Sequence, residues 1–227
     1  MGKKTKLSMF DSTWNPVTGC LHGCEYCYAR TIATRFSNTK AYPKGFEPML
    51  WEDRLDIPKR WTKGRMIFVC SMADLFGEWV PDEWIEKVFD ACKAAPQHTY
   101  FFLTKNPSRY EKLKDKGILP DLPNFWFGSS VTKQHDEFVW FERFSNWFLS
   151  IEPLLEDLGE YISEHKPGWI IIGAETGNRK DKVVPEKKWI DSVTSQLPGV
   201  PVYMKSSLLP VMGEENMRRE FPAGSCR

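Results

Sequence analysis

The chain has 227 residues, of which 41% are hydrophobic and 27% charged, with a formal net charge of +1 at neutral pH. This length suits one sizeable domain, and the small charge gives no overall attraction to nucleic acid or to a membrane surface. No apolar run approaches the roughly 20 residues that span a bilayer, and the N-terminus lacks the apolar segment of a secretion signal. We therefore expect a cytoplasmic protein with a flexible segment over residues 1–9 and one domain over residues 10–227.

A first strand is predicted over about residues 12–15, and a loop rich in cysteine follows it. Cys20, Cys24 and Cys27 have C-x3-C-x2-C spacing, and clustered thiolates select soft partners such as Zn²⁺ or an iron–sulfur cluster. A closed site would use four protein ligands, so three leave one metal position free for another molecule. A zinc site with His22 as the fourth ligand is the alternative interpretation.

The residues after the loop predict a helix and then a long connection. Tyr28, Ile32 and Phe36 recur at i, i+4 and i+8, which predicts a helix with one apolar face. Residues 37–65 are rich in Pro and Gly and form a connection that is longer than an ordinary loop. Long insertions at such positions tend to carry function.

The rest of the chain alternates between short apolar runs and segments with helical periodicity. Helices are predicted to begin near Pro81, Pro107 and Pro185. With the first strand, seven strands are predicted, the others near residues 66–70, 99–103, 125–127, 147–151, 169–172 and 201–204. Repeated β-then-α units with continuous apolar strands predict a parallel sheet covered by helices. The fold class is α/β, and we expect a partial TIM-type (β/α) barrel of about six or seven strands, although a flavodoxin-like open sheet fits the same alternation.

Polar or reactive side chains follow each predicted strand at its C-terminal end. In chain order they are Cys20, Ser71 with Asp74, Thr104 with Lys105, Ser129 with Ser130, Ser150 with Glu152, Glu175, and Lys205 with Ser206. A barrel brings all of these strand ends to one rim, where barrel enzymes keep their chemistry. Two further cysteines, Cys70 and Cys92, fall on apolar elements and are predicted to be core residues.

The cysteine motif, with the aromatic Tyr26 just before its last cysteine, resembles the radical S-adenosylmethionine (SAM) superfamily. Similarity to a compact, phage-encoded branch of these proteins extends over residues 14–16, 71–76, 103–105, 150–154 and 173–177. The resemblance implies that Cys20, Cys24 and Cys27 hold a [4Fe–4S] cluster, whose fourth iron binds the amino and carboxylate groups of SAM. It also implies an electron donor such as flavodoxin or ferredoxin, and cleavage of SAM to a 5′-deoxyadenosyl radical.

The resemblance also assigns candidate SAM contacts. The superfamily's Gly-Gly-Glu motif after strand two is replaced by residues 71–74, where Asp74 takes the place of the Glu, and Glu175 matches part of the adenine-site pattern. The candidate cofactor-binding residues are Tyr26, Ser71, Asp74, Ser129, Ser130, Ser150 and Glu175.

Three more residues at the strand ends are candidate catalytic residues. Glu152 lies at a strand end where a carboxylate must face solvent or a ligand, while Lys105 and Lys205 suit a carboxylate of the substrate or of SAM. The alternative interpretation of these side chains is a rim salt bridge or solvated lysines.

A basic segment in the insertion suggests a substrate. Trp51 and Trp61 are interleaved there with five cations, which suits a surface that tracks a nucleic-acid backbone, although a solvated loop is an equal alternative. These cations are Arg54, Lys59, Arg60, Lys63 and Arg65. Because phages modify their own DNA, we expect the substrate to be a hypermodified, thymine-type base of phage DNA in the host cytoplasm, with isomerase or lyase chemistry. The alternatives are a radical SAM enzyme acting on a free small molecule and a non-catalytic zinc or iron–sulfur module.

Overall fold

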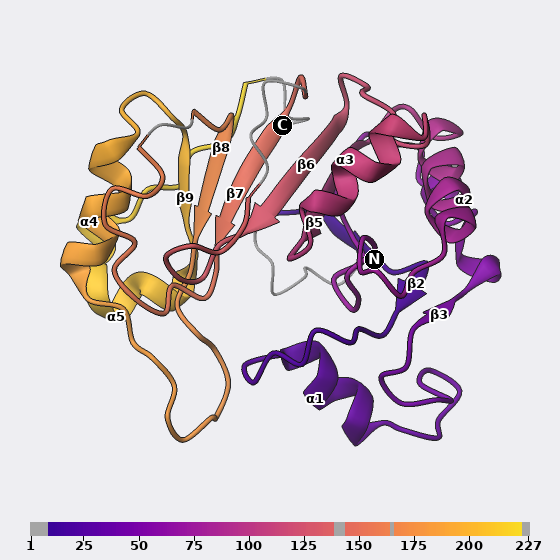
Figure 1. Cartoon of the computed structure of the whole chain (residues 1–227), viewed down its shortest axis with the longest axis horizontal. Coiled ribbons are helices and arrows are strands. Elements are labelled where there is room, and N and C mark those ends of the chain that lie inside the picture. The colour runs from indigo at the N-terminus through magenta and orange to yellow at the C-terminus, as the bar shows by residue number, and fades with distance from the viewer. Residues whose placement is uncertain (1–8, 139–143, 164–165, 224–227) are drawn as a thin grey trace.

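A computed structural model describes residues 9–138, 144–163 and 166–223 of the chain (Figure 1). Its main feature is a curled sheet of seven parallel strands whose order follows the chain. In sheet order these strands are β1 (Ser12–Trp14), β4 (Met66–Val69), β5 (Thr99–Thr104), β6 (Phe125–Ser130), β7 (Trp147–Ile151), β8 (Trp169–Ile172) and β9 (Val202–Met204). A flavodoxin-like sheet would reverse its strand order, so the predicted partial barrel is confirmed. The barrel is open, because β1 and β9 are the two edges of the sheet.

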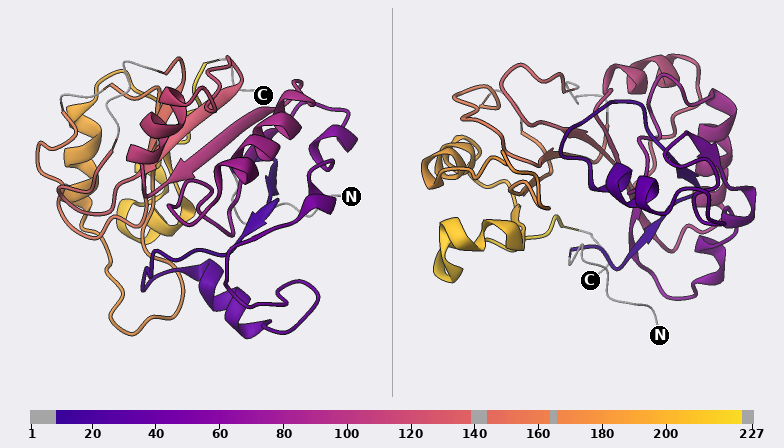
Figure 2. Two further views of the ribbon diagram at one scale, coloured as in Figure 1. Left: turned by 45° about the vertical axis from the view of Figure 1, so that its right-hand side comes forward. Right: turned by 90° about the horizontal axis from the view of Figure 1, so that it is seen from below.

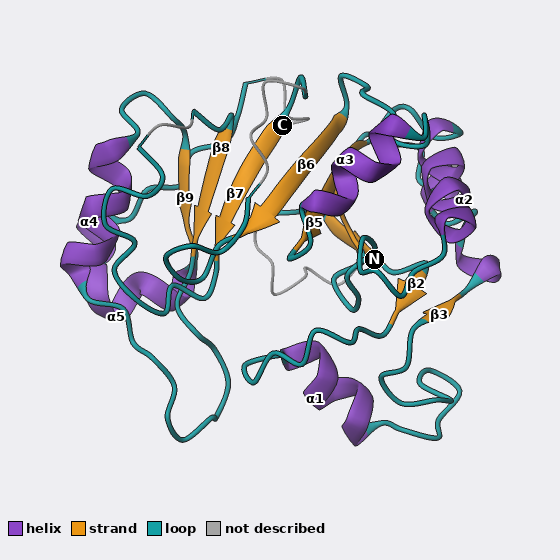
Figure 3. Cartoon of the chain, in the orientation of Figure 1, coloured by secondary structure: helices purple, strands orange, loops and turns teal. Residues whose placement is uncertain are grey.

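The helices are distributed unevenly around this sheet. They are α1 (Tyr28–Arg35), α2 (Asp82–Lys93), α3 (Ser108–Asp115), α4 (Lys187–Gln196) and α5 (Leu209–Met212). Figure 3 shows α2 and α3 beside one half of the sheet, α4 and α5 beside the other, and α1 apart from them near the ends of the strands. Prolines 81 and 107 occupy the N-caps of α2 and α3, where a missing N–H costs nothing. None of the described helices is long and apolar enough to cross a membrane.

The long connection between α1 and β4 contains short elements of its own. A two-stranded antiparallel sheet pairs β2 (Val17–Thr18) with β3 (Met49–Leu50). Two 3₁₀ turns follow, Glu52–Arg54 and Pro58–Arg60. This small sheet lies beside the barrel (Figure 2) and ties residues 49–51 to the segment just before the cysteine loop.

The interior of the barrel is filled by aromatic rings. Phe101, Trp126, Phe148 and Trp169 project inward from β5 to β8 and are almost completely buried. Because side chains alternate along a strand, the same inward positions continue at the C-terminal ends as Lys105 just after β5, Ser130 on β6 and Ser150 on β7. The apolar core therefore changes into a polar pocket at the rim.

The first described residues belong to this interior. Met9 is 1% exposed, and the ring of Phe10 lies 5.1 Å from that of Phe68 and 5.0 Å from that of Phe101. The rest of the predicted flexible segment, residues 1–8, lies outside the described residues.

Helix α1 forms where the sequence predicts it, but its apolar face does not pack on the protein. Tyr28, Ile32 and Phe36 are 49%, 38% and 48% exposed, whereas the small residues Ala29 and Ala33 are buried. The predicted helix with one apolar face is therefore present, and much of that face is exposed. Periodicity identifies which side of a helix is apolar and does not reveal what covers it.

Candidate active site

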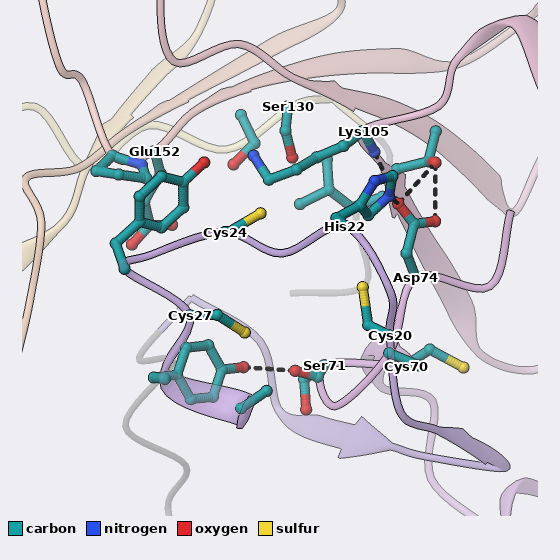
Figure 4. Close-up of a pocket in the computed structure, with 18 of the residues that line it drawn as sticks. Cys20, His22, Cys24, Cys27, Cys70, Ser71, Asp74, Lys105, Ser130 and Glu152 are labelled. Carbon is teal, nitrogen blue, oxygen red and sulfur yellow. Dashed lines mark hydrogen bonds and ion pairs between the residues drawn. The ribbon is translucent and has the colours of Figure 1, made fainter. Parts of the chain in front are cut away.

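A pocket lies at the C-terminal ends of the strands and brings together residues from the whole length of the chain (Figure 4). Its wall includes all three loop cysteines, and every other predicted site residue except Ser129 also lines it. Those other residues are Tyr26, Ser71, Asp74, Lys105, Ser130, Ser150, Glu152, Glu175 and Lys205. Ser129 is completely buried, with its hydroxyl unpaired among the described residues. It projects to the opposite face of β6 from Ser130, because neighbouring side chains on a strand alternate.

Gly19 and Asn15 hold the start of the cysteine loop against the barrel. Gly19 has φ +89°, and a Cβ there would lie 2.1 Å from the carbonyl oxygen of Glu47, so only glycine fits. The Gly19 amide donates to the carbonyl of Met72 over 2.9 Å. The side-chain oxygen of Asn15 accepts from the Met72 amide over 2.9 Å and from the Ser71 hydroxyl over 3.2 Å. These contacts place the loop directly over the end of β4.

Asp74 is the centre of a hydrogen-bond network between the cysteine loop and the strands. Its carboxylate accepts from the Thr104 hydroxyl at 2.8 Å, from the Lys105 amide at 2.9 Å and from the Phe76 amide at 3.0 Å. Nε2 of His22 lies 2.7 Å from Oδ2, the carboxylate oxygen that also accepts from the Lys105 amide. Only 6% of Asp74 is exposed, so this residue joins the loop to β4 and β5.

The cysteines themselves have the donor chemistry that an iron–sulfur cluster needs. Burial raises the pKa of the Cys20 thiol to about 11, and the nearby negative charges of Asp74, Cys27 and Cys24 act in the same direction. Three thiolates in this space therefore need a strongly positive partner, which a metal centre supplies. Cys27 also begins α1, because its sulfur accepts from the amide of Arg30 over 3.4 Å.

A single metal ion and an iron–sulfur cluster make different demands on the cysteines. Among the described residues, no three His, Cys, Asp or Glu side chains are grouped so that they could hold one ion. A [4Fe–4S] cluster takes one thiolate per iron and so does not require three sulfurs to converge on one point. The donor set of Cys20, Cys24 and Cys27, three thiols in one pocket wall, is of the chemical kind that such a cluster uses.

Two ion pairs occupy the far wall of the pocket. Nζ of Lys205 donates to Glu152 over 2.5 Å, so these two candidate catalytic residues form the salt bridge that the sequence left as an alternative. Arg179 donates two hydrogen bonds to Glu175, over 2.7 and 2.8 Å, and these hold the pKa of that carboxyl below its usual range. Arg179 also lies 3.5 Å from Glu25 in the cysteine loop.

Tyr26 and Lys105 face each other across the pocket mouth. Nζ of Lys105 lies 5.4 Å from the centre of the Tyr26 ring, within the range of a cation–π contact. Burial raises the pKa of the Tyr26 hydroxyl, so the ring presents a neutral donor to the pocket at neutral pH.

A family model described as "Protein of unknown function (DUF5131)" matches residues 4–207, which is most of the chain. The chain belongs to this family. No curated protein is similar enough to count as a match.

Solved structures of spore photoproduct lyase resemble this DUF5131 chain in fold. A cysteine-to-serine mutant has a TM-score of 0.55 at 12% identity, over 90% of this chain and 78% of its own. A double mutant with bound AdoMet and dinucleoside spore photoproduct has a TM-score of 0.49 at 12% identity, over 88% and 64%. A complex with dinucleoside spore photoproduct has a TM-score of 0.44 at 13% identity, over 81% and 60%.

Several residues that organise the pocket of this DUF5131 chain were not predicted as site residues. Asn15 belongs to the Trp-Asn-Pro motif at residues 14–16, which was a signal for its importance. Its side-chain oxygen accepts hydrogen bonds from residues 71 and 72. Arg179 had no local signal, because its pairing with Glu175 and Glu25 depends on how the loop after β8 folds back.

The basic segment predicted to hold DNA spans both ends of the barrel. Trp61 packs 6.0 Å from the ring of His98, just before β5 begins, and Arg65 donates to Ser12 at the first residue of β1. The guanidinium of Arg54 covers the Trp51 ring at 3.9 Å. Trp61 and Arg65 therefore lie near the N-terminal ends of the strands, opposite the rim, whereas Trp51 and Arg54 bond to Thr18 and Asn15, just before the cysteine loop.

Proposed function

We propose that this DUF5131 chain is a radical SAM enzyme. The observation that carries the proposal is that Cys20, Cys24 and Cys27 line one pocket with the polar ends of the parallel strands. The three cysteines would hold a [4Fe–4S] cluster and leave one iron for SAM. When bound, these groups would supply, with one electron from a flavodoxin or ferredoxin, the cleavage of SAM to methionine and a 5′-deoxyadenosyl radical.

The chain's own residues would bind SAM and exclude water. Phe46, Phe68 and Leu103 give the pocket apolar walls, which would protect a radical from solvent. Serines 130 and 150 would donate hydrogen bonds to the polar groups of SAM, whereas Ser71, whose hydroxyl donates to Asn15, would accept one. Lys105 is a cation beside Tyr26 and suits a carboxylate of SAM or of the substrate.

We propose a modified nucleobase of DNA as the substrate, of the thymine type found in phage DNA. Spore photoproduct lyase, which has a similar fold, is named for a photoproduct substrate. Lys205 and Glu152 place a donor and an acceptor in the pocket wall, where they bond to each other, and a flipped base that displaced this bond would offer both groups partners on its Watson–Crick edge. A base in a duplex would have to be flipped out to reach them.

Anaerobic reconstitution tests the chemistry. About four irons and four sulfides per chain are expected, with 5′-deoxyadenosine formed from SAM under reductant. The Cys20→Ala variant should lose both the cluster and the cleavage of SAM. The control, Cys92→Ala, changes the buried face of α2 and should keep the cluster while lowering the free energy of unfolding by only about 1 kcal/mol. One tightly bound zinc without SAM cleavage would instead support a non-catalytic zinc module.

A second measurement tests the substrate. Formation of 5′-deoxyadenosine is compared with modified DNA, unmodified DNA and the free modified nucleoside. Modified DNA should stimulate turnover most. Equal stimulation by the free nucleoside, with no DNA binding at low salt, would leave a radical SAM enzyme that acts on a small molecule.

A further inference from the structure

The exposed apolar stripe of α1 is continued by a segment that carries only positive charge. Between Glu25 and Glu47 the chain contains four cations and no acidic residue, the cations being Arg30, Arg35, Lys40 and Lys44. None of these four forms an ion pair within the described part of the chain. By contrast, Lys87, Lys112 and Lys116 are each paired with an acid elsewhere on the surface. We call residues 28–46 the α1 face.

The α1 face is continuous with the mouth of the pocket. Tyr28, Ala29 and Phe46 belong both to this face and to the pocket wall. The hydroxyl of Tyr28 donates to the carbonyl of Ser71 over 2.7 Å, which fixes the first turn of α1 at the rim (Figure 4). Figure 1 shows α1 beyond the C-terminal ends of the strands. A large substrate whose reacting group occupies the pocket would therefore border this surface.

We propose that the α1 face binds the DNA duplex while the modified base occupies the pocket; this inference rests on the proposed function. Unpaired cations suit the phosphate backbone, and neutralising it gives binding that depends steeply on salt. The exposed Ile32 and Phe36 side chains suit contact with the bases that lose their stacking when one base is flipped out. Because this face borders the pocket through Tyr28 and Phe46, it fits the substrate better than an acidic electron-transfer protein.

The chain provides a matched control for the charge. We call Arg35, Lys40 and Lys44 the rim cations, all of which are exposed. We call Lys59, Arg60 and Lys63 the distal cations; these are equally exposed and equal in charge. The distal cations flank Trp61, which packs near the start of β5, so they lie far from the strand ends that form the pocket.

The experiment measures binding of a short duplex that carries one modified or unpaired base, by fluorescence anisotropy at increasing salt. Changing all three rim cations to Ala should weaken binding at least about tenfold and reduce the salt slope by about 2 to 3. The same change of the distal cations should alter affinity by less than about twofold. Phe36→Ser should reduce the preference for the unpaired base over an intact duplex without changing the salt slope.

The outcomes separate failure of this inference from failure of the proposed function. If the wild-type chain binds DNA and the rim and distal variants weaken it equally, the α1 face is not the duplex site, although the DNA substrate stands. If the rim variant binds DNA normally but loses SAM cleavage with reduced flavodoxin and not with dithionite, the face binds the electron donor and the inference is overturned. If the wild-type chain binds no DNA at low salt, both the inference and the DNA substrate fail.

Discussion

At the scale of single residues, Asp74 is a predicted cofactor contact that is also bonded to several groups of the protein itself. Its carboxylate accepts from Phe76, Thr104 and Lys105 and contacts His22, and it is almost completely buried. These bonds use both carboxylate oxygens. Asp74 therefore acts first as a positioning residue that fixes the cysteine loop to the strand ends.

This role predicts the effect of removing the carboxylate. Asp74→Ala should lower the free energy of unfolding by about 2–4 kcal/mol, because two buried amides and a hydroxyl lose their acceptor. The control, Asp90→Ala, removes a carboxylate that is 72% exposed and should change stability by less than about 0.5 kcal/mol. Urea unfolding of the two variants gives the comparison. Unchanged stability with lost SAM affinity would instead identify Asp74 as a direct SAM contact.

At the scale of elements, the loop after β8 and the cysteine loop are joined through one arginine. Arg179 binds Glu175 with two hydrogen bonds and lies 3.5 Å from Glu25, while the amide of Val183 donates to Glu175 over 3.2 Å. The Glu175 side chain is 1% exposed. The charge of this single carboxylate therefore organises residues 175–183 beside the pocket.

The Glu175–Arg179 pair predicts a dependence of stability on pH. The pKa of Glu175 is lowered in the folded chain, mainly by hydrogen bonds from Arg179. Its stabilising effect is therefore complete above the unfolded pKa of about 4.3 and is lost as the pH falls through the lower, folded value. The stability difference between wild type and Glu175→Gln should be largest at neutral pH and shrink towards about pH 3.

Thermal unfolding at several pH values measures this difference. Arg179→Gln removes the same pair from the other side and should give the same trend. A difference that stays constant across the acid range would mean that the charge of Glu175 does not stabilise the loop.

At the scale of the whole molecule, the aromatic side chains inside the partial barrel limit how closely its neighbouring strands can pack. Gly128 on β6 faces Phe148 on β7, and a Cβ at Gly128 would lie 2.4 Å from the tip of that ring. Both residues are buried. A small residue beside a large one thus lets the inward layer of side chains fill the barrel.

This packing predicts a coupled pair of substitutions. Gly128→Ala should destabilise the chain by about 1–3 kcal/mol through overpacking. In a Phe148→Leu background the same change should cost clearly less, because the clashing ring atoms are gone. A double-mutant cycle by urea unfolding measures the coupling. An equal cost in both backgrounds would show that the ring is not what limits residue 128.

The sequence by itself determined the strands, their parallel arrangement and the rim residues. Buried parallel strands are recognisable as short apolar runs, and their C-terminal ends must share one edge of the sheet, so Lys105, Ser130, Ser150 and Glu152 could be placed together in advance. The cysteine motif was equally local, since Cys20, Cys24 and Cys27 lie in one short loop.

Only the tertiary structure decided what each predicted side chain meets. In the folded chain, Lys205 is paired with Glu152, and Ser129 is buried away from the pocket. The apolar stripe of α1 is exposed, and the distal cations lie far from the rim. The openness of the barrel was also decided there, because β1 and β9 remain as edges. The physical reason is that periodicity reports which side of an element is apolar, whereas its neighbours depend on how distant loops pack.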